Sequence, residues 1–245
     1  MPRPVLLIAG GSRGIGAATA KLAAAGGYDV AINYKSNSNA AASVAEAVKK
    51  SGGKALAIAG DMGVDADIER VFDTAGRELG PITHFVHCAG IIGPYSRLDE
   101  ASPQLMREVF EVDTVGALLC LRACVRHMST KNGGKGGSVV MLSSMAAIIG
   151  GAGECVWYAA AKGAVDSMVI GVSREVAKEG MRVNAITPGV IDTDIQPPGR
   201  LERVGPVLPM GRPGQAQEVA EAILFLLSDA ASYVNGANLR VSGAR

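Results

Sequence analysis

Tyr158 and Lys162 are the residues whose types and spacing most directly suggest chemistry. They are four positions apart, so on a helix they would share one face about a turn apart. A tyrosine hydroxyl ordinarily has a pKa of about 10 and is a poor acid or base at neutral pH. A neighbouring ammonium group favours the phenolate and lowers that pKa. The spacing therefore predicts a proton-transfer pair; the alternative is a surface lysine packed over a tyrosine ring.

Two adjacent serines, Ser143 and Ser144, follow an apolar run at Val139 to Leu142. If this run is a strand, Ser144 would point from its carboxyl end, which is the edge where ligands bind in open α/β sheets. Ser144 is therefore the third candidate catalytic residue, and Ser143 is the alternative. The simplest other interpretation is that the two serines only end the strand.

A glycine-rich turn directly follows the first apolar run and precedes a helical segment at 17–25. Its sequence is Gly10-Gly11-Ser12-Arg13-Gly14-Ile15-Gly16. Glycines let the backbone turn tightly and approach a diphosphate, while the N–H groups and dipole of the helix start attract its charge. Strand, glycine turn and helix is the context that gives such a motif meaning. The turn predicts a dinucleotide-binding site; the alternative is a tight turn with no ligand.

Short apolar runs alternate with segments of helical period along the chain. From Ala41 to Val48 the apolar residues recur at i, i+3, i+4 and i+7, which is one stripe of a helix. Runs that are apolar throughout are expected for strands covered by helices on both faces. The pattern predicts a doubly wound α/β fold in one domain, residues 1–245, with about seven strands. The expected strands are Val5 to Ala9, Val30 to Ile32, Ala55 to Ala59, Ile82 to Val86, Val139 to Leu142, Val183 to Ile186 and Asn238 to Val241.

Composition excludes several classes of protein. The chain has 24 basic and 23 acidic side chains, 48% hydrophobic residues and 19% charged residues. Disordered proteins are less hydrophobic and more highly charged, and nucleic-acid binders usually carry a basic excess. No apolar run reaches the roughly 18 residues needed to cross a bilayer. None of the four cysteines is in a Cys-x-x-Cys pair and no signal peptide is evident, so we expect a cytoplasmic protein with reduced thiols.

A long connection near 190–214 is rich in proline and too long to be an ordinary loop. Long loops in compact domains often act as lids. We therefore expect this segment to cover the substrate, although it offers few informative polar groups.

The ordered motifs together resemble the classical short-chain dehydrogenase/reductase family over essentially the whole chain. The motifs are the glycine turn, Tyr158-Ala-Ala-Ala-Lys162, Asn184-Ala-Ile-Thr-Pro188-Gly189 and Tyr233-Val-Asn-Gly236. The nearest branches contain glucose 1-dehydrogenase-like and 3-oxoacyl-carrier-protein reductase-like enzymes. The resemblance implies a Rossmann fold, a small carbonyl or alcohol substrate, and a homotetramer that pairs the helix with Leu118 to Val125 and the helix with Tyr158.

The resemblance also implies a role for each site residue. Tyr158 would pass the proton, Lys162 would lower its pKa and hold the cofactor ribose, and Ser144 would hold the substrate oxygen. Asp61-Met62 would contact adenine, and the segment from Pro188 to Thr193 would lie beside the nicotinamide amide. Hydride would then move between a nicotinamide and a carbonyl or alcohol carbon. The expected cofactor-binding residues are Gly10, Ser12, Arg13, Gly14, Ile15, Gly16, Tyr34, Lys35, Ser36, Asp61, Met62, Ala89, Gly90, Tyr158, Lys162, Pro188, Gly189, Ile191 and Thr193.

The residues after the second strand indicate which nicotinamide is preferred. An acidic residue there would bind the ribose 2′-hydroxyl of NAD, whereas a cation accommodates the 2′-phosphate of NADP. The chain has Tyr34, Lys35 and Ser36 with no acidic residue, and Arg13 lies in the glycine turn. These residues favour NADP(H) over NAD(H); the alternative is that both cations are ordinary solvated charges.

Four residues depart from the family pattern. Ala9 replaces a threonine and His87-Cys88 replaces two asparagines, a loss of polar braces that we expect to weaken the cofactor pocket. Asp113 stands where the family has a catalytic asparagine, and we keep it as a candidate catalytic residue. An NADP-binding sensor or structural subunit with altered catalysis is therefore the alternative function, and an epimerase or dehydratase is the third.

Cys120, Cys124 and His127 fall at i, i+4 and i+7, a spacing that superficially suggests metal ligands. Zinc would need a fourth ligand or an open position. The three residues also lie on one apolar stripe, so we interpret them as core and expect no metal.

Overall fold

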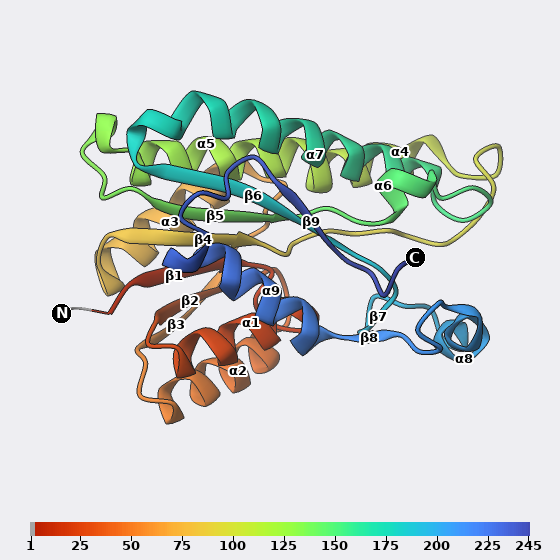
Figure 1. Cartoon of the computed structure of the whole chain (residues 1–245), viewed down its shortest axis with the longest axis horizontal. Coiled ribbons are helices and arrows are strands. Elements are labelled where there is room, and N and C mark those ends of the chain that lie inside the picture. Colours follow the sequence, from red (N-terminus) through yellow and green to blue (C-terminus); the bar gives the residue numbers. More distant parts are fainter. Residues whose placement is uncertain (1–2) are drawn as a thin grey trace.

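Seven parallel strands form the central sheet in this computed structural model, which describes residues 3–245. Their order across the sheet is β3-β2-β1-β4-β5-β6-β9. Together with helices on both faces, this confirms the predicted fold class (Figure 1). The strands are β1 (Val5–Ala9), β2 (Asp29–Tyr34), β3 (Ala55–Ala59), β4 (Ile82–His87), β5 (Gly137–Leu142), β6 (Met181–Pro188) and β9 (Asn238–Val241).

Two layers of helices cover the sheet. One layer packs α3, α5 and α7 over one face, and the other packs α1, α2 and α9 over the opposite face (Figure 1). The helices are α1 (Gly14–Ala25), α2 (Ser38–Lys50), α3 (Asp65–Leu79), α5 (Gly116–Met128), α7 (Val156–Val176) and α9 (Ala216–Leu227). The predicted stripe from Ala41 to Val48 is the buried side of α2.

Both faces of a central strand are buried, which is why its sequence is apolar throughout. Leu7 of β1 packs in the core under α3 and α5, whereas Leu6 and Ile8 pack in the core under α1 and α9. Alternate side chains of a strand point to opposite faces, so two helix layers require apolar residues at every position.

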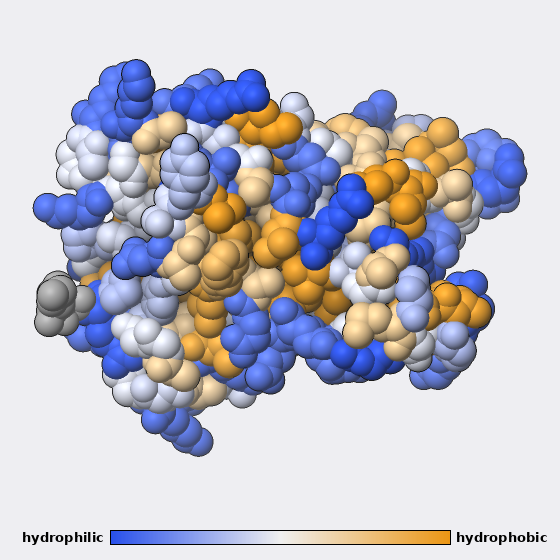
Figure 2. Space-filling view, in the orientation of Figure 1, coloured by the Kyte–Doolittle hydropathy of each residue, from blue (hydrophilic) through white to orange (hydrophobic). Residues whose placement is uncertain are grey.

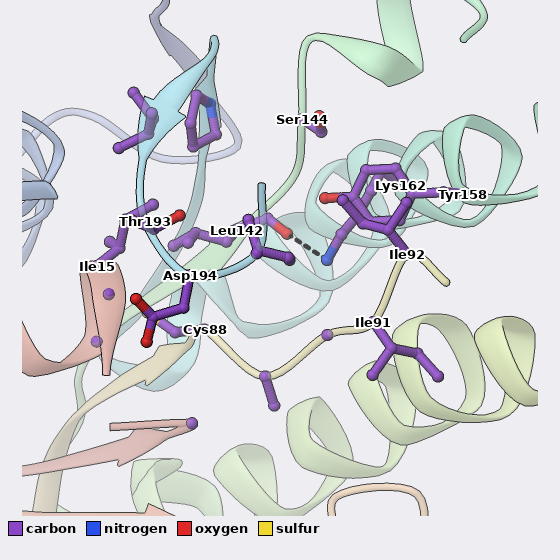
Figure 3. Close-up of a pocket in the computed structure, with 18 of the residues that line it drawn as sticks. Ile15, Cys88, Ile91, Ile92, Leu142, Ser144, Tyr158, Lys162, Thr193 and Asp194 are labelled. Atoms are coloured by element: carbon purple, nitrogen blue, oxygen red, sulfur yellow. Dashed lines mark hydrogen bonds between the residues drawn. The ribbon is translucent and has the colours of Figure 1, made fainter. Parts of the chain in front are cut away.

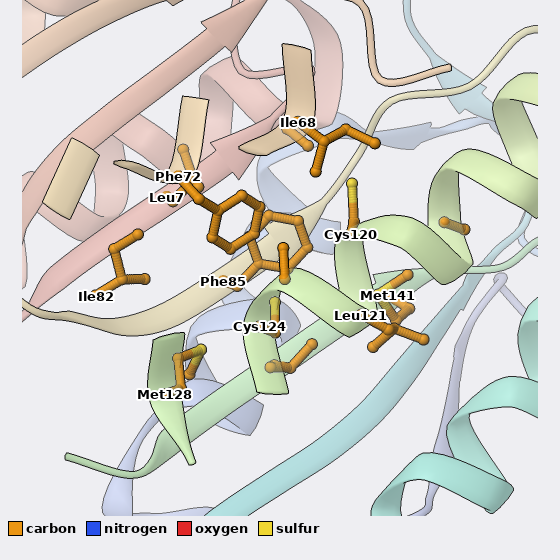
Figure 4. Close-up of a cluster of buried hydrophobic side chains, with 14 of the residues drawn as sticks. Leu7, Ile68, Phe72, Ile82, Phe85, Cys120, Leu121, Cys124, Met128 and Met141 are labelled. Carbon is orange, nitrogen blue, oxygen red and sulfur yellow. The ribbon is translucent and has the colours of Figure 1, made fainter. Parts of the chain in front are cut away.

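The core under α3 and α5 contains the residues that resembled a metal motif. Figure 4 shows Phe72 and Phe85 side by side, with Cys120 and Cys124 of α5 around them. Both cysteines are completely buried, and His127 stacks on Phe72. Within residues 3–245, no three potential ligands come close enough to hold a metal ion.

The sheet order places the site. From the boundary between β1 and β4, the strand order proceeds to one edge through β2 and β3 and to the other edge through β5, β6 and β9. In such sheets the crevice at the carboxyl ends of the strands, where the order reverses, is the usual ligand site. The active site is therefore expected beyond Ala9 and His87, the last residues of β1 and β4.

Several further short elements lie at the carboxyl ends of the strands (Figure 1). The expected lid is partly ordered, because β7 and β8 pair in parallel and α8 lies between them. The elements are α4 (Pro103–Phe110), the π-helical turn η1 (Glu111–Val115), α6 (Ala146–Ile149), β7 (Ile191–Asp192), α8 (Arg200–Val204) and β8 (Gly214–Gln215). Across the described residues, no helix has the length and apolarity that a membrane span requires.

Candidate active site

A cavity of about 350 Å³ opens at the carboxyl ends of the strands. All the residues that the sequence predicts to bind the cofactor line this cavity, and so does Ser144. Asp113 does not line it; its side chain is completely buried behind Lys162. The glycine turn lines one part of the cavity, and Arg200 of α8 in the expected lid lines another part, here called the lid end.

The glycine turn has a geometry that larger residues would not allow. Gly10 has a φ of +74°, and a Cβ on Gly16 would lie 2.2 Å from the Gly10 carbonyl oxygen. Helix α1 starts at Gly14, and its N-cap residue Arg13 makes no side-chain cap. The first N–H groups of a helix lack intrahelical partners. They therefore remain available to a diphosphate, which fits a dinucleotide in this cavity.

Asn33 of β2 braces the glycine turn. Its Oδ1 accepts a hydrogen bond from Gly10 N at 3.2 Å. Its Nδ2 donates to the carbonyl oxygen of Gly60 at 3.0 Å. The brace thus comes from the strand on the other side of β1. The only sign of this brace in the sequence is Asn33 itself, an asparagine inside an otherwise apolar strand.

Just beyond β2 and β3, Lys35 and Asp61 form an ion pair that the sequence does not predict. Lys35 Nζ lies 2.6 Å from Asp61 Oδ2, and the lysine is mostly exposed. Burial raises the pKa of Asp61, but the hydrogen bonds from Lys35 and Gly63 N outweigh it, so the pKa is lowered. The ion pair follows from the sheet. Tyr34 and Ala59 are partners at the ends of β2 and β3, and Lys35 and Asp61 come one and two residues after them.

Tyr158 and Lys162 lie on one side of α7, as their spacing predicts, and both face the cavity (Figure 3). Lys162 Nζ is 5.5 Å from the centre of the Tyr158 ring. The ammonium group donates a hydrogen bond to Leu142 O at 3.1 Å, and the lysine is only 3% exposed. A buried lysine held in this way is not a surface residue packed over a ring, so that alternative is wrong.

Asp113 provides the counter-charge for Lys162. Its Oδ2 lies 3.2 Å from Lys162 Nζ, and its Oδ1 accepts a hydrogen bond from Ile91 N at 2.8 Å. The residue lies in the π-helical turn η1, a type of irregularity that occurs often at functional sites. The carboxylate thus joins the turn before α5 to the loop after β4 and to Lys162.

The pKa values of the three groups follow from burial and from these contacts. Burial lowers the pKa of Lys162, but the charges of Asp113 and Tyr158 outweigh it and raise the pKa. Burial raises the pKa of Asp113, although Lys162 opposes this. Burial also raises the pKa of Tyr158 by more than Lys162 lowers it. Lys162 thus acts on Tyr158 in the expected direction, but the net pKa of the tyrosine is above its ordinary value.

The two serines have different surroundings. Ser143 is buried, and its Oγ donates to the carbonyl oxygen of Lys162 at 3.3 Å. Ser144 is half-buried on the cavity wall near Tyr158, and hydrogen bonding with it lowers the tyrosine pKa (Figure 3). The geometry therefore favours Ser144 over Ser143 as the residue that meets a substrate oxygen.

His87 and Cys88 do not supply a base or a nucleophile. His87 is buried outside the cavity lining, and burial followed by the charge of Lys162 lowers its pKa to about 3. Cys88 lines the cavity, but burial raises its pKa to about 12. A neutral thiol is a weak nucleophile.

At the lid end, three residues that the sequence analysis missed form one cluster. Arg200 of α8 binds Glu154 through two hydrogen bonds, both 2.7 Å long, and lies 4.6 Å from the centre of the Tyr95 ring. All three line the cavity. The 190–214 segment, which we expected to offer few informative polar groups, thus contributes Arg200 to the cavity. The partners of Arg200 come from distant parts of the chain, so no local pattern marks it.

The comparisons with known proteins cover almost the whole chain. A family model described as enoyl-(acyl carrier protein) reductase matches residues 9–243. The uncharacterized oxidoreductase YgfF of Escherichia coli is 41% identical over 98% of this chain and 99% of that protein. Cis-4-hydroxycyclohexanecarboxylate dehydrogenase of Sinomonas cyclohexanicum is 36% identical over 98% of this chain and 95% of that protein.

The structure is similar to that of a blue fluorescent protein from a metagenomic library in complex with NADPH. The TM-score is 0.91 at 30% identity, and the match covers 99% of this chain and 98% of the other.

Proposed function

The chain belongs to the short-chain dehydrogenase/reductase family of oxidoreductases, and we propose that it transfers a hydride between NADP(H) and a carbonyl or alcohol carbon of a small substrate. One observation carries the proposal. The cavity that contains the glycine turn also brings Ser144, Tyr158 and Lys162 to one wall. The nicotinamide, when bound, supplies or accepts the hydride.

The residues of the chain then have separate tasks. Ser144 Oγ orients the substrate oxygen, because it is the serine on the cavity wall. Tyr158 Oη gives a proton to that oxygen during reduction and takes it back during oxidation. Lys162 stabilises the phenolate through its positive charge and holds the cofactor ribose. Asp113 keeps Lys162 charged and positions it at 3.2 Å.

Several groups in the cavity fit the cofactor and favour its phosphorylated form. The uncapped start of α1 offers N–H groups to the diphosphate. Lys35, Ser36 and Arg13 line the adenine end, where no acidic residue follows β2. Asp61 neutralises part of the charge of Lys35, so the pair and Arg13 together carry one net positive charge. That charge attracts a 2′-phosphate.

The lid and the assembly complete the proposal. We retain residues 1–245 as one catalytic domain, with the segment near 190–214 as the cover of the substrate. The four cysteines are free, which supports a reducing compartment such as the cytoplasm.

A homotetramer is supported by two exposed apolar surfaces. Leu118 of α5 and Ile170 of α7 are each 48% exposed. On the face seen in Figure 2, hydrophobic side chains gather over α9 and β9, where Phe225 and Leu239 are exposed. Two different self-complementary surfaces on one chain are what a dimer of dimers needs. Light scattering that finds a monomer at micromolar concentration would contradict this assembly.

The experiment that tests the function measures cofactor binding and turnover separately. NADPH binding is followed by its fluorescence, and NADPH oxidation is followed with a panel of ketones, aldehydes and keto esters. We expect binding together with turnover, and a higher kcat/KM with NADPH than with NADH. Tyr158→Phe should bind NADPH as the wild type does and lose most of the turnover.

Three results would count against the proposal. NADPH binding without turnover of any carbonyl or alcohol compound would favour a sensor or structural subunit. Full activity of Tyr158→Phe would remove the tyrosine from the mechanism. A preference for NADH would end the assignment of NADP(H).

A further inference from the structure

Arg200 has an environment that a purely structural arginine does not need. It is 6% exposed and lies on the cavity wall at the lid end. The two terminal nitrogens of its guanidinium group bind Glu154, and its face lies on the Tyr95 ring. Among residues 3–245, however, no partner accepts a hydrogen bond from its Nε. The group is thus held firmly and keeps one donor unused.

An unused buried donor is costly. Leaving a buried polar group without a partner costs about 1–3 kcal/mol, and more when the group is charged. The same lid segment contains a second case, because Gln196 Oε1 is buried and has no partner in the described part of the chain. Gln196 also lines the cavity. Both orphaned atoms are therefore explained if a ligand completes their hydrogen bonds.

The charges around Arg200 indicate the kind of ligand. Of three nearby arginines, only Arg200 is hydrogen-bonded to Glu154 and lowers its pKa directly; the charges of Arg245 and Arg203 lower it further through space. Arg245 also lines the cavity. A guanidinium group matches the planar geometry of a carboxylate, so Arg200 is suited to a carboxylate ligand.

The position of Arg200 relative to the reacting centre indicates how the ligand is built. Tyr95 packs with Tyr158 and Cys155 in one apolar cluster, and the guanidinium of Arg200 lies against the Tyr95 ring. Met145 and Ile149 line the same cavity. A ligand that reaches from Tyr158 to Arg200 therefore passes along an apolar wall before it meets the charged group.

We propose that Arg200 is a specificity-determining residue that binds a carboxylate of the substrate, so that the preferred substrates are keto acids and the corresponding hydroxy acids. Apolar carbon atoms separate their carboxylate from the reacting carbon. Glu154 and Tyr95 position the guanidinium, and Arg200 Nε donates to the carboxylate. The proposal rests on the proposed oxidoreductase function, and it concerns the substrate class that this site accepts.

Matched pairs of substrates test the proposal by turnover. The pairs are 5-oxohexanoate with its carboxamide and 4-oxocyclohexanecarboxylate with its carboxamide, each reduced with NADPH. We expect kcat/KM for the better keto acid to exceed that for its carboxamide at least tenfold, mainly through KM. Equal or higher kcat/KM for both carboxamides would overturn the proposal and leave the oxidoreductase function intact.

Variants separate binding of the carboxylate from a structural role of the lid. Arg200→Gln combined with Glu154→Gln removes both charges and leaves no buried ion without its partner. We expect the preference for the keto acid to disappear in this double variant. A structural role alone would lower kcat/KM for acid and amide by the same factor and keep their ratio. Arg203→Gln is the matched control, since this exposed arginine is on the same helix but does not line the cavity.

A binding experiment decides the proposal even if no carbonyl compound is turned over. Calorimetry with the Tyr158→Phe protein, saturated with NADPH, measures the affinity of each probe without reaction. Binding of one keto acid at least tenfold tighter than its carboxamide, lost in the double variant, would support the carboxylate site. Affinities within twofold for both pairs would overturn it.

Discussion

Asp113→Asn removes the negative charge beside Lys162 and nearly preserves the shape of the side chain. The amide oxygen of asparagine can still accept the hydrogen bond from Ile91 N, which is now 2.8 Å long. The lost interaction is large, because the charges are 3.2 Å apart and buried. At an effective permittivity of about 20, two such charges attract by about 5 kcal/mol. That energy corresponds to about 4 pKa units for the lysine, before burial is taken into account.

In the Asp113→Asn variant, Lys162 and Tyr158 should both titrate at lower pH than in the wild type. In the wild-type protein the carboxylate raises the pKa of Lys162 above its ordinary value and also raises that of Tyr158. Without it, burial lowers the pKa of Lys162, so the ammonium loses its proton within the alkaline range of the assay. We expect the alkaline limb of alcohol oxidation to move down by about 1–2 pH units, since burial offsets part of the Coulomb energy. The acid limb should move down as well, by less.

The assay is kcat/KM for alcohol oxidation with NADP⁺ between pH 6 and 11, using the best alcohol from the panel. Asp166→Asn is the matched control, because this half-buried aspartate of α7 accepts a hydrogen bond from Asn238 and is not a partner of Lys162. Circular dichroism shows whether each variant is folded. Limbs that coincide with those of the wild type, or that move to higher pH, would refute the electrostatic role of Asp113.

Three further variants test other parts of the site and the core. Lys35→Ala should lower kcat/KM with NADPH at least tenfold and change kcat/KM with NADH much less. The substitution removes the cation and leaves the negative charge of Asp61 near the expected position of the 2′-phosphate. The control is Lys50→Ala, which replaces an exposed lysine of α2. Asn33→Ala should raise the Kd for NADPH and lower the free energy of unfolding by about 1–3 kcal/mol in urea titrations, because Gly10 N loses its partner. Phe72→Ala should cost about 3–5 kcal/mol in the same titrations through the cavity left in the core, and a loss below 1 kcal/mol would contradict its central place.

The elements that the sequence predicts well are those with a local cause. The first, third and last strands begin and end as expected. Each of the other four strands is longer than its apolar run, by one to four residues. Hydrophobic period and the glycine turn are properties of neighbouring residues, so they are visible in the chain itself. The pairing of β7 with β8 was not expected, because each has two residues, too few to form a pattern.

The parts of the site that escaped prediction are contacts between side chains far apart in the sequence. Arg200 and Glu154 are 46 residues apart, and Asn33 and Gly60 are 27 residues apart. Only the arrangement of the sheet and the lid brings each pair together. The types of these residues were visible in the sequence, but their roles depend on tertiary neighbours.

The two ion pairs at the cavity differ in burial, because both side chains of Asp113–Lys162 are buried whereas the Glu154 side chain is 33% exposed. In each pair a carboxylate holds a cation on the cavity wall: Asp113 holds Lys162, and Glu154 holds Arg200. Removing one partner of a buried pair leaves an uncompensated charge and costs about 3–5 kcal/mol. Loss of activity in a single variant of Arg200 would therefore mix instability with lost recognition. Neutralising both partners removes that ambiguity, so a lost preference for keto acids then reports the contact with the substrate.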